Sequence, residues 1–299
     1  MGLQSSGAIS LNEIHIEAGG TSGTQASMND ADIRALIDKN AGATNSFSEY
    51  YGASASLNET VSSSTTNLNV STKFGSSNFT SNTVKVLIIN SGVEVGASNL
   101  SNYAIIVPSG MGGSLTIQNA GTLSGAGGDG SSSGAGGNGG TALYVASNNV
   151  TVTNTGTIRG GGGGGGNGSD GNDGYSGDIA GIWCDGGSGG SGGSGGNGQG
   201  YDQSQSNGSS GSAASSPSCD YPNGMNDGTC NYLCQYIGGT WGAGRTAGSD
   251  GGNGGTYGNS GSQGGGGGGN GGSAGKYIQL ASGISYSLSN SGTLLGNAP

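Results

Sequence analysis

Four cysteines are the side chains of this sequence best suited to covalent chemistry. Cys219, Cys230 and Cys234 lie in the segment CDYPNGMNDGTCNYLCQYIGGTW at residues 219–241, and the fourth is Cys184. An even number is consistent with two disulfides in an oxidising compartment, with three possible connectivities. Free thiols, or a metal site on Cys230 and Cys234, are alternatives, although no histidine lies nearby. We favour disulfides, and one among Cys219, Cys230 and Cys234 would pre-organise the surrounding surface.

Aromatic residues accompany the cysteines in otherwise glycine-rich sequence. Rigid aromatic side chains on exposed loops are typical binding anchors, because they bury a large area at a small cost in conformational entropy. Trp183 and Trp241 could instead fill a small core beneath these loops. The candidate binding residues are Tyr175, Trp183, Tyr201, Tyr221, Tyr232, Tyr236 and Trp241.

The sequence gives little support to catalysis. His15 is the only histidine, and its alternating context predicts a structural residue on a strand, not part of a Ser-His-Asp site. A glycan hydrolase with paired carboxylates stays open, but the aspartates show no pairing signal. The run NGSDGND at residues 167–173 is similar to calcium loops, although the nonapeptide repeat of such loops is absent. We therefore expect no cofactor, with bound calcium as the alternative. The candidate carboxylates are Asp170, Asp173, Asp178, Asp185, Asp220 and Asp227.

Composition excludes several classes of protein. The chain has 299 residues, of which 73 are glycine, with 30% hydrophobic and 8% charged residues. A net charge of −10 with only 7 lysines and arginines argues against a nucleic-acid partner. Four prolines without a Gly-X-Y period exclude collagen. We expect neither a membrane-spanning segment nor a secretory signal, because no apolar run is long enough.

The elements that must position these residues are β repeats. LYVASNNVTVTNTGTIRG at residues 143–160 is similar to residues 103–125 and 277–296, and a weaker copy, VKVLIINSGVEVG, begins near Val84. No copy can bury its apolar face alone, so the copies should stack in a solenoid-like or sandwich-like array.

The alignment of these copies predicts equivalent positions. Ile117, Val152 and Leu288 should face inward in successive copies. The asparagines that follow them should serve equivalent turns, because asparagine tolerates the left-handed conformation. These asparagines are Asn119, Asn154 and Asn290.

The glycine block is an insertion, because the last β repeat follows it. Its runs lie at residues 160–166, 186–198, 251–255 and 264–272. Polyglycine II has three residues per turn, and without Cβ atoms neighbouring segments can exchange backbone hydrogen bonds. Since ordered glycine loses much entropy, many segments must align to offset that cost. A packed polyglycine II bundle is therefore predicted, with a flexible linker as the alternative.

The first fifty residues are of a different kind. Alternating apolar residues at positions 9–16 predict a strand pair or a strand with a bulge. Ser27 with Asp30 predicts the start of an amphipathic helix at about residues 29–40. This α/β segment has too small a core to be stable alone and should dock on the rest of the chain, on copies of itself or on a partner. A small capping subdomain without a partner is the alternative. The candidate attachment residues are Ile33, Leu36, Ile37, Phe47, Tyr50 and Tyr51.

The predicted fold is mainly β with irregular structure, in four regions. Residues 1–56 form an N-terminal attachment domain, and residues 57–125 hold β repeats. Residues 126–275 are glycine-rich, interrupted by a β repeat at 141–160 and a Cys/aromatic loop module at 201–245. Residues 276–299 form the last β repeat.

Two segments resemble proteins of phage virions. GAISLNEIHIEAGGTSGTQASMNDADIRALI and ATNSFSEYYGASA, within residues 7–55, resemble the N-terminal segment of phage structural proteins. The glycine block is similar to the distal adhesins of T-even-like long tail fibres, whose tips are packed polyglycine II helices. The resemblance implies a virion protein at the tail tip or fibre end. It would bind other fibre proteins through residues 1–56, a host surface protein or glycan through its aromatic loops, and copies of itself. A purely structural component and a tailspike-type hydrolase are the alternatives.

Overall fold

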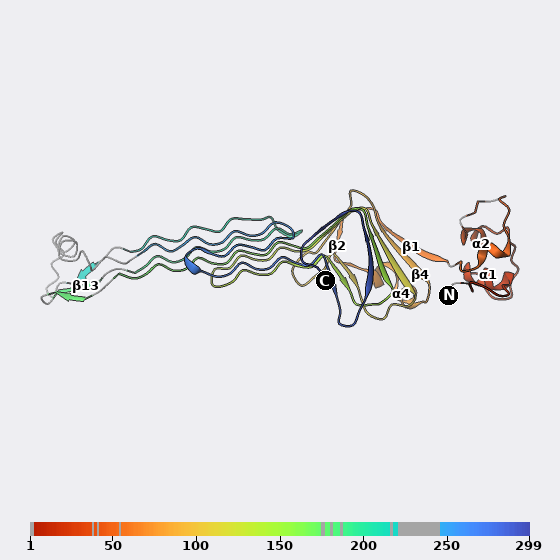
Figure 1. Cartoon of the computed structure of the whole chain (residues 1–299), viewed down its shortest axis with the longest axis horizontal. Coiled ribbons are helices and arrows are strands. Elements are labelled where there is room, and N and C mark those ends of the chain that lie inside the picture. Colours follow the sequence, from red (N-terminus) through yellow and green to blue (C-terminus); the bar gives the residue numbers. More distant parts are fainter. Residues whose placement is uncertain are drawn as a thin grey trace.

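A computed structural model describes residues 3–37, 39–40, 42–53, 55–174, 177–179, 182–185, 188–215, 218–220 and 246–299. The molecule is elongated, with three parts in a line (Figure 1). A small helical module lies at one end, three β-sheets lie in the middle, and long glycine-rich segments run to the other end. None of the helices in the described part of the chain is long and apolar enough to cross a bilayer.

The N-terminal module (residues 3–53) starts with a helix where strands were predicted. Helix α1 spans Leu11–Glu17. Ser10 and Glu13 form a capping box, in which the Glu13 N–H donates to Ser10 Oγ at 3.2 Å and the Ser10 N–H donates to the Glu13 carboxylate at 2.7 Å. The strand prediction was therefore wrong, because the Ser-x-x-Glu signal outweighs the short apolar alternation.

The second helix of the module is shorter than predicted. Helix α2 spans only Ala31–Ala35, and a 3-10 turn, η1, spans Phe47–Tyr50. The buried Arg34 guanidinium donates to the carbonyl oxygens of Asn40 and Ala43, so the chain turns back around this side chain after α2.

The central part, the three-sheet region, consists of three parallel sheets that the chain visits in turn. The first sheet has the order β1-β4-β7-β10-β16, the second β17-β11-β8-β5-β2 and the third β15-β9-β6-β3. The bounds in the first sheet are Ser56–Val61, Val84–Ile89, Ser114–Asn119, Val150–Asn154 and Tyr286–Asn290. In the order given above, those in the second are Thr293–Leu295, Thr157–Arg159, Thr122–Ser124, Glu94–Gly96 and Thr65–Thr66. Those in the third are Ile278–Leu280, Leu143–Val145, Ile105–Val107 and Leu68–Asn69, and the short helices α3 (Val70–Phe74) and α4 (Ser76–Thr80) precede β4.

The register of the first sheet confirms the predicted equivalence of the repeats. Val152 pairs with Ile117 on one side and with Leu288 on the other. Ile117 and Val152 are fully buried, and Leu288 packs against the same core. The weaker copy near Val84 also joins this sheet as β4.

The three aligned asparagines do not adopt the predicted left-handed conformation. They end their strands side by side, and their amides form a ladder. Asn119 Nδ2 donates to Asn154 Oδ1 at 2.7 Å, and Asn154 Nδ2 donates to Asn290 Oδ1 at 2.7 Å. Asparagine is needed because it is both donor and acceptor, which lets one amide join two neighbouring repeats.

All glycine insertions leave the three-sheet region between its second and third sheets. In each repeat one segment joins a strand of the second sheet to a strand of the third, and its length differs greatly between repeats. The segment is Asn67 alone between β2 and β3, residues 97–104 between β5 and β6, residues 125–142 between β8 and β9, and residues 160–277 between β11 and β15. The block is therefore an insertion in a repeat array, as predicted.

The inserted segments form the glycine arm (residues 125–140, 160–174, 188–215 and 246–275; Figure 1). Backbone hydrogen bonds repeat every third residue. The N–H groups of Gly164, Gly165 and Gly166 donate to Gly137, Gly196 and Ser262, on three different neighbouring segments, at 2.7–3.1 Å. A short 3-10 turn, η2 (Gly265–Gly267), lies in the last segment.

Candidate functional site

The far end of the glycine arm carries a small antiparallel sheet (Figure 1). It consists of β12 (Gly177–Ile179), β13 (Ile182–Asp185) and β14 (Ser218–Asp220) in that order. Trp183 lies in the central strand, paired with Asp178 on one side and Asp220 on the other. Cys184 lies directly opposite Cys219. One candidate tryptophan and two candidate cysteines are thus brought together at this distal sheet.

Most of the other predicted binding residues belong to the segment that follows β14. This segment starts after Asp220 and ends before Thr246, whose N–H donates to the Asn172 carbonyl at 3.1 Å beside the distal sheet. Asp220 and Thr246, the described residues that flank this segment, therefore both lie at the far end of the arm. The candidates that lie outside the described residues are Tyr175, Tyr221, Tyr232, Tyr236, Trp241, Cys230 and Cys234.

Tyr201 does not join this group. Its N–H donates to the Gly125 carbonyl at 3.1 Å, at the base of the arm. Its ring lies on Gly96 of β5, where an added Cβ would be 2.0 Å from Tyr201 Cγ. Tyr201 therefore packs the arm onto the second sheet.

A polar cluster that sequence reasoning missed lies at the same base. Arg159 Nη2 is 3.0 Å from Glu94 Oε1, and the Arg159 guanidinium carbon lies 3.7 Å from the centre of the Tyr257 ring. Arg159 Nε also donates to Ser124 Oγ at 2.9 Å. Burial raises the pKa of the Tyr257 phenol, so it stays neutral beneath the guanidinium. No local sequence signal joins residues so far apart in the chain.

Acidic and amide side chains on the arm accept backbone hydrogen bonds. Asp170 and Asp173 accept from the N–H groups of Gly192 and Gly189, each at 2.8 Å, and Asn167 accepts from Gly134 at 2.7 Å. Within the described residues, no three His, Cys, Asp or Glu side chains are grouped as for a metal ion. The run considered for calcium thus supplies acceptors that join glycine segments.

His15 lies on helix α1, not on the predicted strand. Its Nε2 is 2.8 Å from Thr24 Oγ1.

The candidate attachment residues divide into buried and exposed sets. Ile33 and Tyr50 form the core of the N-terminal module with Ile14, and Leu36 and Ile37 pack against it. Phe47 and Tyr51 are 41% and 38% exposed. Ile16, which the strand prediction placed in a pair, is 45% exposed on α1. A groove of about 850 Å³, lined by residues that include Leu3, Ile9, Ile16 and Leu57, lies where the module meets β1.

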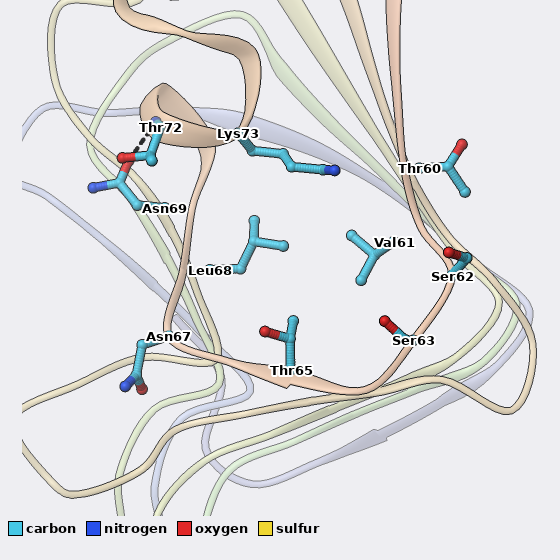
Figure 2. Close-up of a pocket in the computed structure, with 10 residues that line it drawn as sticks. All are labelled: Thr60, Val61, Ser62, Ser63, Thr65, Asn67, Leu68, Asn69, Thr72 and Lys73. Carbon is cyan, nitrogen blue, oxygen red and sulfur yellow. Dashed lines mark hydrogen bonds between the residues drawn. The ribbon is translucent and has the colours of Figure 1, made fainter.

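A second hollow lies at the end of the three-sheet region that is formed by β1, β2 and β3, the first rung of this region. It has a volume of about 480 Å³ and is lined by β1, β2, β3 and α3, with Val61 and Leu68 pointing into it (Figure 2). Its other lining residues are mostly hydroxyl and amide side chains. Strands β1, β2 and β3 are each the last strand of their sheet, so their outer edges are available for pairing.

Taken together, these features define an elongated, mainly β protein with a small helical module at one end and the distal sheet at the other. A family model described as phage tail fibre adhesin Gp38 matches residues 56–299, and the chain belongs to this family. It is therefore a phage tail fibre adhesin and a component of the virion. The N-terminal module lies outside the matched residues.

A solved structure supports the fold. The chain is similar to a chain of the gp37–gp38 adhesin tip complex of the bacteriophage S16 long tail fibre, with 19% identity and a TM-score of 0.51 over 99% of this chain and 100% of that chain. At this identity, the likeness shows a shared fold. A comparison with curated proteins gave no match.

Proposed function

We propose that this adhesin forms the distal end of a long tail fibre and binds the host surface through residues 221–245 and the distal sheet. The observation that carries the proposal is the position of Asp220 and Thr246. Asp220 ends β14, which pairs with β13 at the end of the arm opposite the N-terminal module (Figure 1), and the Thr246 N–H donates to the Asn172 carbonyl. Loops held on a rigid scaffold are a common location for binding residues. The role is one of binding, not catalysis.

Replacement of the tyrosines in this segment tests the proposal. Each aromatic anchor contributes about 1 kcal/mol or more to binding, so the triple variant Tyr221→Ala, Tyr232→Ala and Tyr236→Ala should weaken adsorption of purified protein at least about 100-fold. Tyr51→Ala, at the other end of the molecule, is the matched control and should adsorb normally. Equal adsorption by the two variants would place the receptor site elsewhere. Sugar released from host envelopes would favour a hydrolase.

The N-terminal module is the proposed attachment site for a fibre protein. Support comes from its exposed apolar side chains Ile16, Phe47 and Tyr51 and from the groove beside β1. The related structure is a gp37–gp38 complex, which suggests a partner of the gp37 kind for this chain too.

Changing exposed residues tests attachment without disturbing the module core. Phe47→Ser combined with Tyr51→Ser should sharply reduce incorporation into fibres, since it removes apolar contact area. Leu100→Ser, which alters an equally exposed residue of the three-sheet region, is the control. Normal incorporation of the double variant would exclude this surface. Light scattering on the same samples measures whether the adhesin self-associates, as the sequence suggested.

We also propose a more specific description of the architecture. We treat the three-sheet region as a β-solenoid and the glycine arm as a polyglycine II bundle. Each complete repeat takes one strand from each of the three sheets, which supports a solenoid. The three-residue hydrogen-bond period and the backbone angles of Gly264 (φ −68°, ψ 155°) support polyglycine II. The four regions expected from the sequence, with boundaries at 56, 125 and 275, remain the proposed domain division.

A further inference from the structure

We propose that Cys184 and Cys219 form a disulfide that closes the distal end of the glycine arm. The two residues are direct partners in the antiparallel pairing of β13 with β14. Direct partners in such a pair have Cβ atoms about 4.5–5.5 Å apart, closer in pairs without hydrogen bonds. A disulfide spans about 3.5–4.5 Å between Cβ atoms, so a small strand adjustment is enough to form the bond. Of the connectivities left open by the sequence, the proposal favours this one over a bond from Cys219 to Cys230 or Cys234.

The hydrogen bonds of the arm support the same register independently. The N–H groups of Ser209, Ser212 and Ser215 donate to the carbonyls of Ser194, Ser191 and Ser188, at 2.8–2.9 Å. The same three pairs are joined a second time, because the N–H groups of Ser194, Ser191 and Ser188 donate to the Oγ atoms of their partners at 2.7–2.8 Å.

The serine pairs and the distal sheet share one antiparallel register. Four residues before Ser188 is Cys184, and four residues after Ser215 is Cys219. A slip of one residue in the sheet would break the register with every serine pair of the arm. The arm therefore fixes which two cysteines meet.

Oxidation by a low-molecular-weight disulfide balances the reaction. The Cys184 thiolate attacks one sulfur of the small disulfide and expels one small thiolate, which leaves a mixed disulfide. The Cys219 thiolate then attacks the Cys184 sulfur, forms the new S–S bond and expels the second small thiolate. The two protons of the cysteine thiols end on the two small thiols, and the small disulfide takes up the two electrons.

The proposed bond bears on adhesion, and only this part rests on the proposed function. Cys219 precedes Tyr221 by two residues, so the cross-link would hold β13 and β14 together at the point where residues 221–245 begin. Fixing that starting point lowers the conformational entropy that the segment loses when it binds.

Peptide mapping of the wild-type protein decides the connectivity. Cleavage before aspartate, after thiols are blocked and without reductant, separates the cysteines into peptides 178–184, 202–219 and 227–249. The proposal expects peptides 178–184 and 202–219 to be joined, with 227–249 attached to neither. Peptide 227–249 joined to either one would overturn the connectivity. Blocked thiols on Cys184 and Cys219 would overturn the bond itself. The adsorption experiment is separate, so adhesion can fail while the bond is present.

A pair of variants measures the effect of the bond. Reductant should lower the melting temperature of the wild-type protein by about 5–10 °C, because the bond restricts the unfolded chain. In the variant that combines Cys184→Ser with Cys219→Ser, reductant should no longer change the melting temperature. Cys230→Ser combined with Cys234→Ser is the matched control, and reductant should still lower its melting temperature. The opposite pattern would contradict the proposal.

Discussion

Replacing Gly164 with alanine tests whether the arm is held by close backbone contact. Gly164 is buried in the central segment, where its N–H donates to the Gly137 carbonyl and its own carbonyl accepts from Gly272, both at 2.8 Å. A Cβ at this position would lie 1.9 Å from the Asp129 carbonyl oxygen and 2.4 Å from the carbonyl carbon. Both obstacles are backbone atoms, so no side-chain rotation relieves the contact.

The cost follows from this geometry. Ordinary contact begins at 3.4 Å, so the segments that hold Gly164 and Asp129 must separate by about 1.5 Å. This separation stretches the hydrogen bonds that the Gly128 and Ser131 N–H groups donate to the Gly162 and Gly165 carbonyls. Overpacking of this kind costs about 1–3 kcal/mol, and stretching two backbone hydrogen bonds adds about 1 kcal/mol each. Alanine returns about 0.4–1 kcal/mol by restricting the unfolded chain. The free energy of unfolding should therefore fall by about 2–4.5 kcal/mol, which lowers the melting temperature by roughly 5–15 °C.

Scanning calorimetry of purified Gly164→Ala, with limited proteolysis to locate the opened region, is the assay. Ser194→Ala is the control, because Ser194 is at an exposed position of the same three-residue period and should change the melting temperature by less than about 1–2 °C. The reasoning is refuted if Gly164→Ala and Ser194→Ala have the same melting temperature.

Three further perturbations test the three-sheet region. Asn154→Ala breaks both bonds of the buried amide ladder and should cost about 2–4 kcal/mol in denaturant unfolding, whereas the half-buried, outward Thr153→Ala should cost little. Burial lowers the pKa of the Lys85 ammonium below its ordinary 10.5. The unfolded chain then binds more protons, so stability relative to Lys85→Met should rise as the pH increases from the lowered pKa towards 10.5. A flat difference between the two pH series would count against this. Arg159→Met removes a partly exposed ion pair and the contact with Tyr257, and should cost about 1 kcal/mol and speed proteolysis at the base of the arm. An unchanged cleavage rate would argue against a role of Arg159 in holding the base of the arm to the second sheet.

The repeats were predictable because their signal is local and periodic. Ile117, Val152 and Leu288 recur before Asn-x-Gly, and parallel pairing then places them in one row. The first rung was not recognised, because β2 and β3 have only two residues each. The helix at α1 was missed although its Ser-x-x-Glu capping signal was present, since apolar alternation was given more weight.

The positions of the binding candidates depend on non-local geometry. Tyr201 looks like Tyr175 in sequence, since both lie in glycine-rich surroundings. An extended segment rises about 3.1 Å per residue, so the segment from residue 160 to 174 advances roughly 43 Å and the next one returns about as far. Tyr201 therefore lies at the base of the arm. Counting along successive segments would have separated it from the distal residues.

An ordered arm suits an adhesin better than a glycine linker of the same length. A free linker of about 15 glycine-rich residues has an average end-to-end distance of roughly 20–23 Å and no fixed direction. An extended segment of that length reaches about 45 Å. The arm also continues the hydrogen bonding of the sheets, since the Gly125 N–H donates to the Arg159 carbonyl and the Gly160 N–H donates to the Leu295 carbonyl, each at 2.9 Å. Bending the arm would require many backbone hydrogen bonds to break together. The arm thus about doubles the reach of the distal sheet and fixes its direction, and in the proposed contact with the host this would reduce the entropy lost on binding.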